Sequence, residues 1–178
     1  MRIWLCSRWV ASARNFCLVG IFAGSAVLMS SSAETYAAMP GRPDGAEVKL
    51  VTDCLADAVK NNTAQDVCIG RVIAQCIKTT SAYQEKKACS DREFLVWSES
   101  LNHDFSELTK RLQEGDLRQA LNEVQRNFYA EKASKCAFER NARANSPEAL
   151  FAASVCDVQS TARQDLWLRA QIGALGNP

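Results

Sequence analysis

Six cysteines between residues 54 and 156 constrain the fold of this 178-residue chain more than any other feature of its sequence. They form three consecutive pairs, whose midpoints lie at residues 61, 82–83 and 146, where the sequence predicts turns between helices. In a helical hairpin, residues at equal distances from the turn lie opposite one another, which brings each pair within bonding distance. We therefore predict the disulfides Cys54–Cys68, Cys76–Cys89 and Cys136–Cys156.

A zinc site formed by the first four of these cysteines is the alternative interpretation. The Cys-x-x-Cys spacing typical of structural zinc sites does not occur in the sequence. An even number of cysteines in an exported chain is typical of a disulfide framework. The sequence therefore favours disulfides over bound zinc.

The first 33 residues have the composition of a secretory signal peptide. Three arginines precede residues 15–33, which carry no charge and have an apolar centre at residues 16–23. An uncleaved membrane anchor is the alternative, because the uncharged segment approaches the length of about 20 residues that spans a bilayer. Its glycines and its run of serines favour a cleaved signal peptide instead.

Small residues favour cleavage after Ala33, and Ala37 offers a second site. Cleavage also removes Cys6 and Cys17, so the six paired cysteines remain. The mature chain is then expected in a bacterial periplasm or outside the cell, with no segment that spans the membrane.

The charge and composition exclude several classes of protein. The full chain has 21 basic and 20 acidic residues, and removal of three arginines with the signal leaves 18 and 20, a net charge of about −2. A protein without a basic surface is poorly suited to bind nucleic acid, because phosphate contacts need many Lys and Arg side chains. With 47% hydrophobic and 23% charged residues, the chain has the composition of a folded domain.

Residues 34–45 contain two prolines and two glycines and are expected to form a flexible linker. Residues 46–172 repeat apolar side chains at helical spacing, which predicts one all-α domain, and residues 173–178 form a short tail. The domain is expected to be a small helical bundle held together by disulfides. Its five expected helices span residues 46–60, 63–78, 85–113, 116–144 and 147–172.

Apolar residues on the last three helices predict the core of this bundle. The third helix is expected to bury Phe94, Trp97, Leu101, Phe105, Leu108 and Leu112. The fourth is expected to bury Leu117, Leu121, Val124 and Phe128. The fifth is expected to bury Phe151, Val155, Val158, Ala162 and Leu166.

Three sequence signals predict helix ends. Thr63 and Asp66 have the spacing of a capping box at the start of the second helix. Gly115 is expected to end the third helix in a left-handed conformation, directly before the N-cap of the fourth. Ser146 and Pro147 predict the cap and the first residue of the fifth helix.

The sequence provides little evidence for catalysis. His103 is the only histidine, and Glu99 and Glu107 lie four residues on either side of it. These three side chains would share one helix face, where they could bind a metal or act as an acid–base set, but a solvated ion-pair surface explains them equally well. No glycine-rich phosphate loop and no Gly-x-Ser-x-Gly motif occurs. We therefore predict no catalytic residues, no metal site and no cofactor.

The order of residues in the second half of the chain resembles the LprI-like lysozyme-inhibitor domain, a small exported bacterial domain that is helical and contains cysteines. The pattern runs from Cys89 to Arg163 in the order expected for this family. Its other members here are Trp97, Leu101, Asn102, Gln125, Arg126, Phe128, Cys136, Cys156 and Thr161. The chain departs from the pattern at Phe128, where the family has Trp, and at Lys132-Ala133, where it has Arg-Asp.

The resemblance implies a non-catalytic binding protein whose partner is a protein, namely a lysozyme that it inhibits. A structural or adaptor protein of the cell envelope is the alternative function. Asn102, Gln125 and Arg126 are polar residues that the core does not need, and they are the candidate partner-binding residues. Their alternative role is to join helices through buried hydrogen bonds.

Overall fold

The computed structural model describes residues 43–144 and 146–176, and this part of the chain is all-helical, as predicted. The signal peptide and most of the linker lie outside the described residues. Three long helices are α3 (Tyr83–Arg111), α4 (Gly115–Asn141) and α5 (Pro147–Ala174). The N-terminal part contains α1 (Gly45–Lys60), η1 (Gln65–Cys68), α2 (Arg71–Cys76) and η2 (Ile77–Thr79). None of the described helices is long and apolar enough to cross a membrane.

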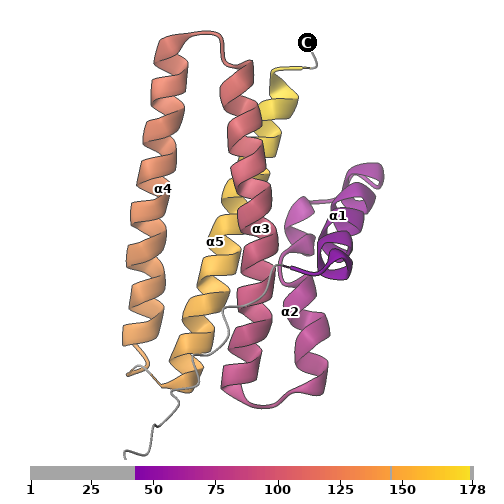
Figure 1. Cartoon of the computed structure of the whole chain (residues 1–178), viewed down its shortest axis with the longest axis vertical. Helices are drawn as coiled ribbons and strands as arrows, with labels where there is room; N and C mark the ends of the chain where they lie inside the picture. The colour runs from indigo at the N-terminus through magenta and orange to yellow at the C-terminus, as the bar shows by residue number, and fades with distance from the viewer. Residues whose placement is uncertain (1–42, 145, 177–178) are drawn as a thin grey trace, which may run out of the picture. The chain divides into compact units, whose positions relative to one another are not determined.

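Helix α3 is the centre of the arrangement, with α5 packed along one side and α1 and α2 on the other, while α4 packs on α5 (Figure 1). The predicted stripe of α3 provides much of the core, because Trp97, Leu101 and Leu108 are buried. Helix α5 contributes Val158 and Ala162 to the same core. It also contributes Leu168, which is not among the core residues predicted for this helix.

Helix α4 buries less of its apolar surface than the sequence predicted. Leu121 is buried as expected, but Leu117 and Val124 are wrongly predicted core residues, since 48% and 40% of their surfaces are exposed. The reason is that α4 packs against its neighbours along a narrow line that contains Leu121, Gln125 and Cys136. Apolar residues on either side of that line face solvent.

The second predicted helix is broken into shorter elements. Gly70 adopts a left-handed conformation with φ +89°, which interrupts the helix between η1 and α2. The capping box predicted at Thr63 and Asp66 is also wrong: Ala64 precedes η1 without a side-chain hydrogen bond, and the Thr63 hydroxyl donates to the Ala58 carbonyl instead. A capping box occurs at the start of α1, between Asp44 and Glu47.

The ends of the long helices follow the sequence signals in part. Ser146 caps α5 as predicted, because its hydroxyl accepts a hydrogen bond from the Ala149 N–H, and Pro147 is the first residue of the helix. Gly115 does not form the predicted left-handed exit from α3. The chain leaves α3 at Leu112 in an extended conformation, and Gly115 is already the first residue of α4.

All three predicted disulfides are confirmed. Cys54–Cys68, Cys76–Cys89 and Cys136–Cys156 have Cα–Cα distances of 5.7, 5.7 and 5.5 Å. The first joins α1 to η1, the second joins α2 to α3, and the third joins α4 to α5. Because the first four cysteines form disulfides, their sulfur atoms cannot act as thiolate ligands, and the alternative prediction of a zinc site is wrong.

Candidate functional site

A shallow open groove of about 560 Å³ lies between α3 and the N-terminal half of α4, and we call it the α3–α4 groove. Arg118, Asn122 and Arg126 follow one another at four-residue intervals, so they form one row along α4. Aromatic side chains and amides complete its lining, which consists of Phe105, Gly115, Arg118, Gln119, Asn122, Gln125, Arg126 and Tyr129.

The groove contains two of the three candidate partner-binding residues. Gln125 is buried and its side-chain oxygen accepts a hydrogen bond of 3.3 Å from Gln164, which joins α4 to α5. Arg126 is exposed and its guanidinium lies 3.8 Å from Glu123. Asn102 is exposed on α3, one helical turn before Phe105. Gln125 therefore has the alternative role of joining helices through a buried hydrogen bond, whereas Asn102 and Arg126 face solvent.

Two residues of the family pattern, Phe128 and Thr161, meet around Lys132, which stands where the family has Arg. Its ammonium lies 4.8 to 5.6 Å from the ring centres of Phe94, Phe128 and Tyr129, within the range of cation–π attraction. It also lies 3.4 Å from the hydroxyl of the buried Thr161. Burial lowers the pKa of Lys132. This cluster holds the middle of α4 against α3 and α5.

The remaining residues of the family pattern divide between core and surface. Leu101 is buried, and Trp97 is fully buried with its indole N–H donating to the carboxylate of Glu93 at 3.0 Å. Arg163 is exposed on α5. The pattern therefore identifies packing residues together with a few exposed polar ones.

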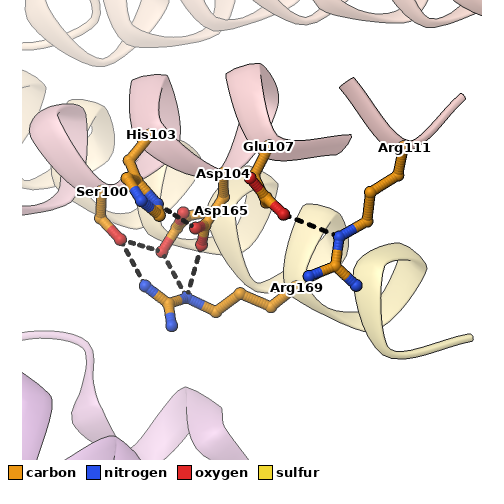
Figure 2. A network of polar contacts seen from close by, with 7 residues as sticks. All are labelled: Ser100, His103, Asp104, Glu107, Arg111, Asp165 and Arg169. Carbon is orange, nitrogen blue, oxygen red and sulfur yellow. Dashed lines mark hydrogen bonds and ion pairs between the residues drawn. The ribbon is translucent and has the colours of Figure 1, made fainter. Parts of the chain in front are cut away.

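The structure contains a polar cluster between α3 and α5 that the sequence did not predict. Figure 2 shows the buried carboxylates of Asp104 and Asp165 converging on Arg169, whose Nε lies 3.0 Å from an oxygen of each. The Ser100 hydroxyl donates to Asp165 at 2.9 Å, and the ring of the exposed His103 lies 2.8 Å from Asp104. One signal was available, since Asp104 and Asp165 interrupt the apolar faces of their helices.

The cluster does not match the alternative acid–base or metal set around His103. Glu107 pairs with Arg111 at 2.8 Å, and this hydrogen bond lowers the pKa of the Glu107 carboxyl. His103 contacts Asp104 instead. Within residues 43–144 and 146–176, no three His, Cys, Asp or Glu side chains gather in a way that could hold a metal ion.

The buried carboxylate of Asp165 predicts an unusual pH dependence of stability. Burial raises the pKa of Asp165 from its ordinary 3.8 to about 6, against the opposing effects of Arg169 and Ser100. The folded protein therefore binds this proton more tightly than the unfolded chain does. We expect the contribution of Asp165 to the free energy of unfolding to increase by about 1–3 kcal/mol as the pH falls from above 6 to about 4.

Thermal unfolding of the wild type and Asp165→Asn between pH 4 and 8 measures this contribution. The variant removes the titrating group, so its stability relative to the wild type should be highest above pH 6 and should decline toward pH 4. Asp53→Asn is the control, because Asp53 is exposed on α1. A constant difference between wild type and Asp165→Asn at every pH would contradict the assignment.

The fold and the groove define a class: a small helical domain, linked by three disulfides, with an open polar surface groove. A family model described as Lysozyme inhibitor LprI matches residues 76–168, and the chain belongs to this family. The match extends from the end of α2 into α5 and includes the groove, whereas α1 and the Cys54–Cys68 disulfide precede it. No curated protein and no solved structure is significantly similar to the chain.

Proposed function

We propose that this protein is a periplasmic or secreted inhibitor of a lysozyme, which acts by binding the enzyme and has no catalytic activity of its own. Membership of the LprI family is the observation that carries this proposal. The three disulfides support it, because disulfides persist in oxidising compartments outside the cytoplasm, where lysozymes act.

The α3–α4 groove is the surface that we propose for partner binding. Arg126 is an exposed part of its lining, and Asn102 is exposed on α3 one helical turn before Phe105. Gln125 lines the groove and joins α4 to α5 through its hydrogen bond with Gln164. Arg and Tyr side chains contribute strongly to many protein interfaces, and the groove contains Arg118, Arg126 and Tyr129.

An assay of cell-wall lysis tests the proposed function. Purified mature protein is mixed with c-type, g-type and i-type lysozymes, and the loss of turbidity of a cell-wall suspension is followed. We expect a concentration-dependent decrease in the rate for at least one enzyme. Protein that has been reduced, alkylated and unfolded by heat is the control and should not inhibit. Unchanged rates for all the enzymes at tens of micromolar protein would overturn the proposal.

An envelope adaptor is the second candidate function, and the exposed apolar side chains of α4 favour it. Leu117, Val124 and Phe138 all leave large parts of their surfaces in solvent, and such residues are typical of contact surfaces when they gather. An adaptor would bind an envelope protein without affecting lysis. Isothermal titration against the lysozymes, beside the lysis assay, separates the two functions.

A further inference from the structure

We infer that the row Arg118–Asn122–Arg126 on α4 binds the catalytic carboxylates in the substrate cleft of the inhibited lysozyme. This inference rests on the proposed function and names the chemistry of the contact. It predicts inhibition by occupation of the cleft, in competition with the glycan substrate.

The two arginines of the row are available for an external partner. The guanidinium of Arg118 has no hydrogen-bond or ion-pair partner among the described residues. Arg126 lies 3.8 Å from Glu123, and both side chains of this pair are mostly exposed. Exposed ion pairs of this kind contribute little free energy, so Arg126 can exchange Glu123 for another carboxylate at small cost.

The local charge of the groove is opposite to the charge of the chain. None of the residues that line the groove is acidic, and two are arginines. The mature chain as a whole is expected to be weakly acidic, with 18 basic and 20 acidic residues once the three signal-peptide arginines are removed. The groove lining is therefore positively charged, with Glu123 beside it offsetting part of the Arg126 charge, and the exposed amides of Gln119 and Asn122 supply further hydrogen-bond donors.

A lysozyme offers the complementary group. Enzymes that hydrolyse glycosidic bonds generally place two carboxyl groups, roughly 5–9.5 Å apart, on either side of the scissile bond. Four residues of helix rise about 6 Å, so Arg118 and Arg126 start about 12 Å apart, with Asn122 between them. Long arginine side chains can converge from these positions, and guanidinium–carboxylate pairs form short, strong hydrogen bonds.

The row lies on a largely exposed stretch of α4. Helix α4 packs against the bundle along a narrow line, so most of its residues from Gly115 to Tyr129 are exposed. In Figure 1, α4 forms one edge of the set of long helices. A helix at an edge is open to a large partner, and the long arginine side chains can reach out of the shallow groove, with Phe105 and Tyr129 supplying apolar contact beside them.

Steady-state kinetics with a soluble glycan-oligomer substrate test the inference on a lysozyme that the wild type inhibits. We expect the wild-type protein to raise the KM of the enzyme and leave kcat unchanged. Arg118→Gln combined with Arg126→Gln should weaken inhibition by about 100-fold, because each lost charge pair at an interface costs roughly tenfold or more in affinity. Thermal unfolding and circular dichroism establish that this double variant is folded.

Arg140→Gln is the matched control, because it removes the same charge from α4 about 21 Å along the helix from Arg126. It should inhibit like the wild type. On the enzyme side, replacing the catalytic Glu by Gln should weaken binding measured by isothermal titration. Full inhibition by the double variant, or inhibition that leaves KM unchanged, would overturn the inference while the proposed function stands. If the wild-type protein neither inhibits nor binds any of the lysozymes, both the inference and the proposed function would be overturned.

Discussion

Glu93→Ala is expected to destabilise the protein by about 3–5 kcal/mol. Glu93 is fully buried in α3, and its carboxylate accepts hydrogen bonds from the backbone N–H groups of Gly70 and Ile73, at 2.6 and 2.9 Å, and from the Trp97 indole at 3.0 Å. It thereby caps the start of α2 from another helix. Alanine would leave three donors without an acceptor, and each unsatisfied buried donor costs about 1–3 kcal/mol.

Urea unfolding followed by tryptophan fluorescence and far-ultraviolet circular dichroism measures this loss. Glu131→Ala is the control, because Glu131 is exposed on α4 and its removal should change stability by less than about 0.5 kcal/mol. Glu93→Gln should lie between the two, since one amide oxygen can still accept from the former donors. Equal stability of Glu93→Ala and Glu131→Ala would show that the three hydrogen bonds do not hold α2 in place.

Reduction of the disulfides is expected to loosen the N-terminal elements before the long helices. Cys54–Cys68 and Cys76–Cys89 close loops around α1, η1 and α2, which are shorter than the other helices and bury aliphatic side chains such as Val51, Leu55 and Val72 but no aromatic ring. Each disulfide of this loop length contributes about 2–4 kcal/mol through restriction of the unfolded chain. Helices α3 and α5 retain a continuous apolar contact when the bonds are cut, so they should remain protected longer.

Hydrogen exchange with and without reductant measures the order of loss. We expect amides of residues 45–80 to exchange first. Cys54→Ser with Cys68→Ser should reproduce this local effect, whereas Cys136→Ser with Cys156→Ser should loosen the junction of α4 and α5. Uniform loss of protection over all five α-helices would show that the disulfides stabilise the whole fold equally.

The sequence was sufficient to predict the features of the fold that depend on residues close together in the chain. The disulfide pairs follow from helix geometry on either side of a turn, because positions equidistant from the turn face each other. The core stripe of α3 follows from the 3.6-residue period, and Trp97 and Leu101 are buried as it predicts. Ser146 and Pro147 determine the start of α5, because a cap needs only its own side chain and the next backbone amides.

The tertiary structure decided the features that depend on partners distant in sequence. The α2 cap is a glutamate located 20 and 23 residues from the amides that it binds, and Asp104 meets Asp165 through Arg169 on another helix. Periodicity also assigned Val124 to the core, but the width of the buried strip on α4 depends on how closely α5 approaches it.

The sequence by itself determined which residues can pair within a hairpin and which face of a helix is apolar. The arrangement of the helices determined which polar groups are buried together and which arginines stay in solvent, because burial is a property of neighbouring elements and not of a single helix.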